Sequence, residues 1–120
     1  MSYNAVQEKS YAFALRVIEV YRFLIDKRKE FVFAKQLLRS GTSIGANVEE
    51  AIGGQTERDF FAKMNIAYKE ARETHYWLRL LRDSKIISPE MATSTLTDCD
   101  ELLKLSGSII KTLKQKRTAK

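Results

Sequence analysis

Residues 35–51 read KQLLRSGTSIGANVEEA, and this stretch decides which kind of fold the chain can form. Apolar and small side chains recur in it at steps of three and four residues, the spacing that places side chains on one face of an α-helix. We therefore predict one helix over residues 31–53. Two neighbouring stripes run along it: Phe31, Ala34, Leu38, Gly41, Gly45, Val48 and Ile52, and beside them Phe33, Leu37, Ser40, Ile44, Asn47 and Ala51.

Gly41 and Gly45 are unusual within a helix, where a glycine costs about 1 kcal/mol relative to alanine. Four residues apart on the predicted core seam, they would let two helix axes approach closely. The alternative is a phosphate-binding loop, but this needs a G-x-x-x-x-G-K-[ST] order between a strand and a helix, and the stretch has neither. We expect close helix packing.

The same spacing predicts helices over residues 4–27, 57–83 and 89–116. Gly53 and Gly54 can end the second helix through a left-handed cap. Thr56 is a fitting N-cap for the third helix, and Ser88 followed by Pro89 is a typical start for the fourth. A turn is expected within residues 26–30, because an unbroken helix over residues 4–53 would be about 75 Å long.

Four helices with short connections predict one domain, residues 1–120, folded as an all-α, antiparallel up-down-up-down four-helix bundle. The first two helices carry two apolar stripes each. The stripes of the first are Tyr11, Ala14, Ile18, Tyr21 and Ile25, and Phe13, Val17, Val20 and Leu24. The second stripes either cover one core generously or contact another copy of the chain, since large apolar surfaces are rarely exposed on monomers.

Composition excludes several classes of protein. A chain that is 44% hydrophobic and 30% charged is typical of a globular domain rather than a disordered one. No apolar run is long enough to cross a membrane, and the first residues do not resemble a secretion signal. One cysteine in 120 residues cannot form an internal disulfide, so we expect a reducing, cytoplasmic location.

The sequence gives little support to a catalytic or metal site. We expect that the protein is not an enzyme and binds neither a metal nor a cofactor. Di-iron bundles use Glu-x-x-His pairs, but the single histidine, His75, follows Arg72 at that spacing. The one cysteine, Cys99, lies on the predicted core face. Glu70 and Glu73 share a stripe with Trp77 and should be paired, with Arg39, Asn47 or Arg72 as partners; a binding or catalytic site is the alternative.

The formal net charge of +6 comes entirely from residues 102–120, which contain six basic residues and no acidic one. Clustered bases can neutralise phosphates, although a lysine-rich helix end also suits the helix dipole and solubility. The candidate nucleic-acid-binding residues are Lys111, Lys114, Lys116, Arg117 and Lys120 in the basic tail, residues 111–120, with Arg16, Lys35 and Arg39 as smaller basic points on the first two helices.

The strings KQLLRSGTSIGANVEEA (Lys35–Ala51) and FFAKMNIAYKEARETHYWLRLL (Phe60–Leu81) resemble the signature segments of the bacterial 23S ribosomal RNA intervening-sequence proteins, a family related to the accessory variability determinant of diversity-generating retroelements. The segment Glu8–Leu24 fits as well. Where many members have Ile-Ala-Glu-Gly after the asparagine, this chain has Val48-Glu49-Glu50-Ala51. The residues that match the family's structural motif, with the two glycines on the same seam, are Gly41, Ser43, Gly45, Asn47, Glu50, Glu70, Glu73 and Trp77.

The resemblance implies a bundle that assembles into a cyclic homopentamer. It implies contact with RNA or DNA, and a reverse transcriptase or another protein as a partner, and it supplies no catalytic residue. We therefore expect a non-catalytic, oligomeric protein associated with RNA or serving as an adaptor for a nucleic-acid enzyme. The alternative is a protein-interaction scaffold that does not bind nucleic acid.

Overall fold

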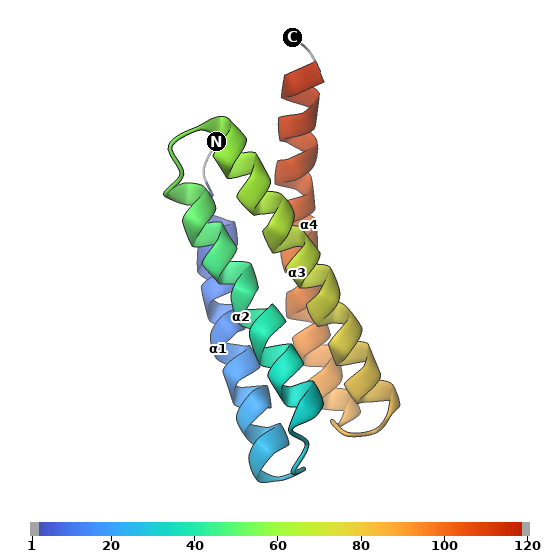
Figure 1. Cartoon of the computed structure of the whole chain (residues 1–120). Coiled ribbons are helices and arrows are strands. Elements are labelled where there is room, and N and C mark those ends of the chain that lie inside the picture. The colour runs from blue at the N-terminus through green and yellow to red at the C-terminus, as the bar shows by residue number, and fades with distance from the viewer. Residues whose placement is uncertain (1–2, 119–120) are drawn as a thin grey trace.

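The computed structural model describes residues 3–118, and within that range the chain forms four α-helices and no strand. They are α1 (Asn4–Asp26), α2 (Val32–Ile52), α3 (Glu57–Asp83) and α4 (Pro89–Thr118). The helices lie along one long axis, so the molecule measures 52 × 22 × 21 Å (Figure 1). The prediction of an all-α chain with four helices is confirmed.

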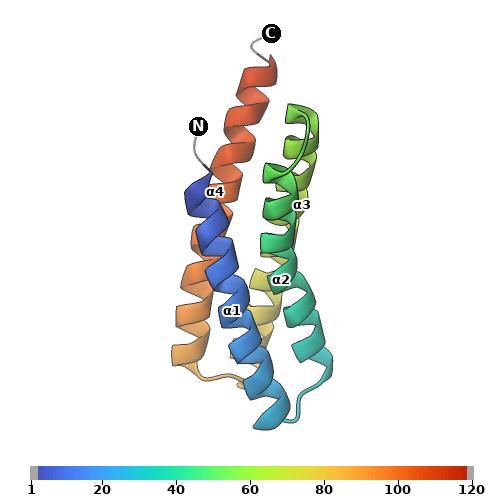
Figure 2. The same ribbon diagram turned by 90° about the vertical axis from the view of Figure 1, so that its left-hand side faces the viewer.

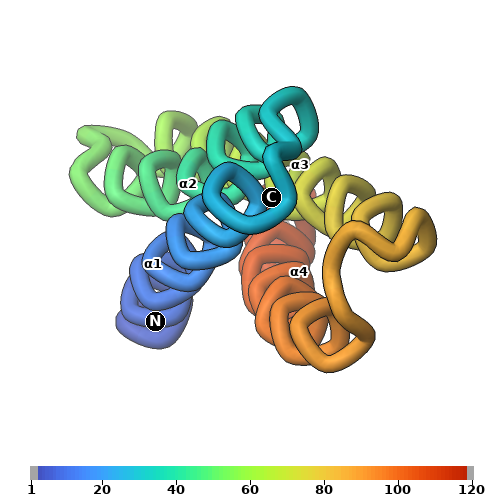
Figure 3. The backbone as a smooth tube through the Cα atoms, turned by 90° about the horizontal axis from the view of Figure 1, so that it is seen from below, coloured from blue at the N-terminus to red at the C-terminus, as the bar shows by residue number. Residues whose placement is uncertain are grey.

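Each helix packs against its neighbours in sequence, and α4 also contacts α1. The α1–α4 contact is the least extensive of the four, and Figure 3 shows these two helices diverging. The α1–α2 and α3–α4 turns lie at one end of the molecule, while the α2–α3 turn lies toward the other, with the start of α1 and the end of α4 (Figures 1 and 2).

The two apolar stripes of α1 and α2 have different environments. On α1, the stripe that includes Phe13 and Val17 is buried, whereas Tyr11 of the other stripe is 65% exposed. On α2, most of both stripes is buried, because this helix packs against both α1 and α3. Both stripes of α2 therefore cover this chain's own core, and only the α1 stripe that includes Tyr11 is left partly uncovered.

Gly41 and Gly45 bring α2 very close to α1. A Cβ atom at Gly41 would lie 2.7 Å from Cγ2 of Val17, and one at Gly45 would lie 3.2 Å from the backbone oxygen of Ser10. Protein interiors are close-packed, so side chains at these positions would displace α1. The prediction that the glycines serve close helix packing is confirmed.

The helix starts follow the predicted capping, but one helix end does not. Thr56 Oγ1 accepts a hydrogen bond from the Asp59 N–H at 3.0 Å, and Ser88 Oγ accepts one from the Met91 N–H at 3.1 Å. The left-handed cap predicted at Gly53 and Gly54 is wrong, because no glycine in residues 3–118 has a positive φ.

Gly53 instead keeps a right-handed conformation, with φ −80°, and its N–H donates to the Glu49 oxygen at 3.0 Å. The α2 helix therefore ends with one further helical hydrogen bond, made by its C-cap residue. The left-handed residues are Lys29, with φ 54°, and Lys85, with φ 63°. They lie in the two turns at the opposite end of the molecule.

A few polar groups are buried in the core, and they are hydrogen-bonded. The hydroxyl oxygens of Ser40 on α2 and Thr74 on α3 are 2.9 Å apart, and the Cys99 thiol donates to the Ala71 oxygen at 3.3 Å. Among the described residues, no buried side-chain nitrogen or oxygen lacks a hydrogen-bond partner. The core therefore avoids the cost of unpaired polar groups.

Candidate functional site

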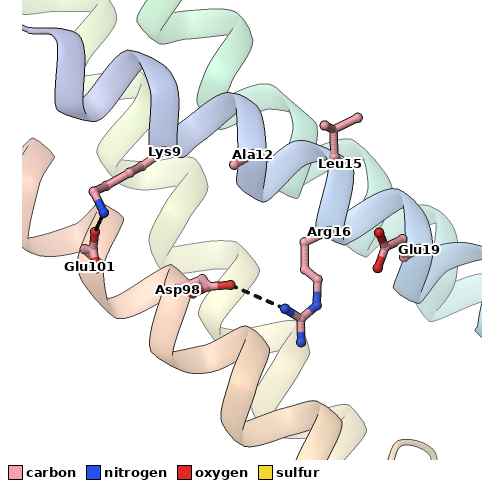
Figure 4. A pocket seen from close by; sticks show the side chains of 7 residues that line it. All are labelled: Lys9, Ala12, Leu15, Arg16, Glu19, Asp98 and Glu101. Atoms are coloured by element: carbon pink, nitrogen blue, oxygen red, sulfur yellow. Dashed lines mark ion pairs between the residues drawn. The ribbon is translucent and has the colours of Figure 1, made fainter.

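The candidate basic residues lie on several faces of the molecule. Arg16 on α1 points toward α4, where its guanidinium is 3.7 Å from Asp98 Oδ2 (Figure 4). Arg39 on α2 pairs with Glu70 and Glu73 of α3, and Lys35 is exposed on α2. These three residues do not join the basic end of α4 in one surface.

The last turns of α4 are attached to α3 by two of the predicted tail residues. Lys116 Nζ is 3.3 Å from Glu57 Oε2, and the Arg117 guanidinium carbon lies 5.0 Å from the centre of the Phe61 ring, within cation–π range. Lys116 and Arg117 therefore already have partners in this chain. Lys120 lies outside the described residues.

Lys111 and Lys114 line a hollow of about 370 Å³ between α3 and α4. Asn65 and Tyr68 form its α3 side, and the backbone of Gly107 forms part of its α4 side. Both lysines are exposed and make no ion pair with another described residue. Of the predicted tail, these are the two described lysines with charge available to a ligand.

A second hollow of about 260 Å³ continues along the same two helices, and Tyr68 lines both. Arg72, His75, Arg79 and Asp100 surround it. Arg79 Nε donates to His75 Nδ1 at 3.0 Å, which places the imidazole hydrogen on Nε2, 3.0 Å from Asp100 Oδ1. We call the two hollows together the α3/α4 groove.

The α3/α4 groove is basic. Its lining contains four Lys and Arg side chains and one carboxylate, Asp100, which is paired with His75. The cations belong to one face of each helix, since they follow helical spacing on α3 and on α4. They are Arg72, Arg79, Lys111 and Lys114.

The pocket between α1 and α4 has the opposite balance. It measures about 500 Å³, and its lining pairs Lys9 and Arg16 with three carboxylates, Glu19, Asp98 and Glu101 (Figure 4). The hydrogen bond and charge of Glu101 raise the pKa of Lys9. The bases of this pocket are already matched by acids, so it offers a phosphate little attraction.

Sequence reasoning missed the α3 side of the groove. Tyr68, Arg72, His75 and Arg79 recur at steps of four, three and four residues, which is one helix face. Gly107, Lys111 and Lys114 recur in the same way on α4. The sequence therefore contains both helix faces as regular spacings, but only the packing of α3 against α4 shows that the two faces meet.

The acidic residues of the family motif form a network of structural contacts. Arg39 pairs with Glu70 at 3.3 Å and with Glu73, and Trp77 Nε1 donates to Glu73 Oε2 at 2.9 Å. Of the three residues predicted as partners of Glu70 and Glu73, Arg39 is the one that pairs with them. Asn47 instead donates to the Ser43 backbone oxygen at 2.9 Å and to its hydroxyl at 3.1 Å.

Nucleophilic catalysis and metal binding find little support among the described residues. Burial raises the pKa of the Cys99 thiol to about 12, so the thiolate nucleophile is scarce at neutral pH. Residues 3–118 contain no group of three or more His, Cys, Asp or Glu side chains placed to hold a metal ion. None of the four described helices has an apolar stretch long enough to cross a bilayer.

Comparisons with known proteins agree with this architecture. The family model described as 23S rRNA-intervening sequence protein matches residues 3–108. A crystal structure of a protein of unknown function from the S23 ribosomal protein family of Bacteroides thetaiotaomicron is 52% identical, with a TM-score of 0.88. The match covers 90% of this chain and 96% of that one. None of the curated proteins matches the chain.

Proposed function

The chain belongs to the family of 23S rRNA-intervening sequence proteins, and from this premise we propose that it is a non-catalytic, cytoplasmic, oligomeric protein that binds RNA along the α3/α4 groove. The observation that carries the proposal is the charge of the groove: four cations and one paired carboxylate line a hollow with an aromatic ring at its middle. Cations supply the sequence-independent part of nucleic-acid affinity by displacing counterions from phosphates.

The two groups of cations suit different parts of this task. Lys111 and Lys114 are exposed ammonium groups one helical turn apart, which suits successive phosphates of a flexible backbone. Arg72 and Arg79 stand at the far side of Tyr68 and present planar guanidinium groups, which bind phosphate oxygens in pairs. A nucleic acid along the groove would therefore meet cations on both sides of the ring.

Assembly is the second part of the proposal. The four helices form an antiparallel up-down-up-down bundle, and five copies form a ring. Large apolar side chains are exposed on α3, including Ile66 at 40%, Tyr76 at 47% and Leu80 at 37%, and such surface favours contact with another chain. A ring would present several basic grooves to one nucleic acid, which raises avidity without new contacts.

A salt series tests the binding. Fluorescence anisotropy of a labelled RNA would compare the wild-type chain with a double variant, Lys111→Gln/Lys114→Gln. The matched control is Lys27→Gln/Lys35→Gln, which removes the same charge from exposed positions outside the groove. We expect the groove variant to bind more weakly and to lower the slope of log K against log salt by about 1.4, since each phosphate contact contributes about 0.7 for a single strand.

Two results would overturn the proposal. One is the absence of RNA binding by the wild-type chain at low salt. The other is equal weakening by the groove variant and the control, because binding would then depend on net charge rather than on the groove.

A protein-interaction scaffold or adaptor is the second candidate, with a reverse transcriptase as one possible partner. The observation that favours it is the α1 surface, where Tyr11 is 65% and Leu15 is 51% exposed beside the α1/α4 pocket. This candidate predicts a stable complex with a protein partner after nuclease treatment, and no RNA affinity of the isolated chain.

A further inference from the structure

We infer that the α3/α4 groove is built for single-stranded RNA, with one base stacked on Tyr68 and neighbouring phosphates held by Lys111 and Lys114. The inference rests on the proposed RNA-binding function and specifies which form of RNA the groove takes.

Tyr68 stands between the two hollows of the groove, because it lines both. Its ring lies against the bare backbone of α4 at Gly107, where a Cβ atom would be 3.4 Å from Cε1 and 3.9 Å from Cδ1. Since glycine carries no side chain, the half-buried ring can approach the α4 backbone, and the hollow that Lys111 and Lys114 line lies beside it. An aromatic wall next to an open hollow is the arrangement on which nucleobases stack.

Contacts between α3 and α4 bridge the groove near both of its ends. At the end near the chain terminus, Lys116 pairs with Glu57 and Arg117 lies over Phe61. At the other end, His75 Nε2 bonds to Asp100 Oδ1 at 3.0 Å. A preformed hollow binds a ligand without the cost of ordering its own walls.

Polar groups beside the ring can bind the edge of a base. Asn65 Nδ2 donates to the Phe61 backbone oxygen at 2.8 Å, which fixes the amide and leaves its Oδ1 as an acceptor at the groove. Gln115 lines the same hollow from α4. Base edges of unpaired RNA are recognised by such hydrogen bonds, combined with stacking on aromatic side chains.

The recessed ring distinguishes the two forms of RNA. In a duplex the bases are stacked inside the helix, and a protein meets phosphates, 2′-hydroxyls and the shallow minor groove. Such a surface can reach Lys111 and Lys114, which are exposed, but no base can reach Tyr68 between the helices. A single strand can turn a base outward, so that the base stacks on Tyr68 while the phosphates contact Lys111 and Lys114.

The test uses the full chain with two labelled probes, a short oligouridine and an RNA duplex of equal length. The variants are Tyr68→Leu, which removes the ring, and Tyr68→Phe, which keeps it. We expect the wild-type chain and Tyr68→Phe to bind the oligouridine alike, and Tyr68→Leu to bind it about tenfold more weakly. The duplex affinity and the salt slope should stay unchanged, because no charge is altered.

Gly107→Leu provides a second, independent variant, because it fills the hollow while the ring remains. It should weaken oligouridine binding and leave duplex binding unchanged; it decides the matter if Tyr68→Leu does not fold. Equal wild-type affinity for both probes, or full oligouridine affinity in the folded Tyr68→Leu or Gly107→Leu variant, would overturn the single-strand inference but leave RNA binding intact. Failure of the wild-type chain to bind either probe would instead overturn the proposed function itself.

Discussion

Gly41 of α2 faces Val17 of α1 at a separation that leaves no room for a side chain, since a Cβ atom at Gly41 would be 2.7 and 2.8 Å from the two methyl carbons of Val17. Val17 is fully buried, so it has no free space into which it could move. The distance between α1 and α2 is therefore set by the absence of a side chain at one position.

Gly41→Ala should lower the free energy of unfolding. Overpacking costs about 1–3 kcal/mol, which exceeds the gain of about 1 kcal/mol from replacing a helical glycine by alanine. Gly107→Ala is the matched control, because its Cβ atom would meet Tyr68 at an ordinary 3.4 Å; it should be neutral or stabilising. Urea unfolding at one protein concentration measures both. Equal stability of the two variants would contradict the close-packing explanation.

Much of the fold could be predicted because its signals are local. Helical spacing revealed four helices, and hydroxyl residues before Glu57 and Pro89 marked two helix starts. The cap at Gly53 was predicted wrongly because glycine permits a left-handed conformation without requiring it. Lys29 and Lys85 have that conformation instead, and nothing in a lysine side chain signals it.

The candidate site was only half predictable, because it depends on which helix faces meet. The excess of basic residues at the end of α4 predicted Lys111 and Lys114 as site residues. The same prediction included Lys116 and Arg117, which have partners on α3. Those partnerships join residues far apart in the sequence. The opposite wall, with Tyr68 in its centre, became visible only when α3 and α4 were placed side by side.

Cys99 should make stability fall with increasing pH in alkaline solution. Burial raises the pKa of its thiol from 9.0 to about 12, so between these values the unfolded chain loses the proton and the folded chain keeps it. Unfolding is then favoured by up to about 1.4 kcal/mol per pH unit, and the effect fades as the pH falls below 9.0.

Cys99→Ala should remove that contribution. The measurement is the difference in unfolding free energy between the wild-type chain and Cys99→Ala across this pH range, which cancels the titration of lysines and tyrosines common to both. A constant difference would show that the thiol ionises equally in both states.

Arg39→Gln should destabilise the chain only modestly, by about 1 kcal/mol or less, because its side chain is half exposed and exposed ion pairs contribute little. The loss should shrink in high salt, which screens the attraction to Glu70 and Glu73. Lys35→Gln, one helical turn earlier on α2, is the control for loss of charge alone. Thermal unfolding of both variants at low and high salt distinguishes a specific pair from a general charge effect.

Polar substitution of exposed apolar residues on α3 should weaken self-association. Tyr76→Ser/Leu80→Ser removes two exposed apolar side chains, so the helices should remain folded while the assembly dissociates at higher protein concentration. Tyr11→Ser/Leu15→Ser on α1 is the matched variant. Sedimentation velocity measures the result: unchanged mass for the first variant, with dissociation of the second, would place the interface on α1 instead.

The hydroxyl pair of Ser40 and Thr74 has a consequence for how α2 and α3 align lengthwise. Both residues are buried, and their oxygens meet at 2.9 Å. An apolar seam with a repeat of about one helical turn would tolerate a shift of α3 along α2 by one turn, since one aliphatic layer resembles the next. Such a shift would separate the two hydroxyls and remove the hydrogen bond between the helices. This buried contact, together with the pairing of Arg39 with Glu70 and Glu73, therefore favours one register of α3 along α2, and replacing both hydroxyl residues by alanine should weaken that preference.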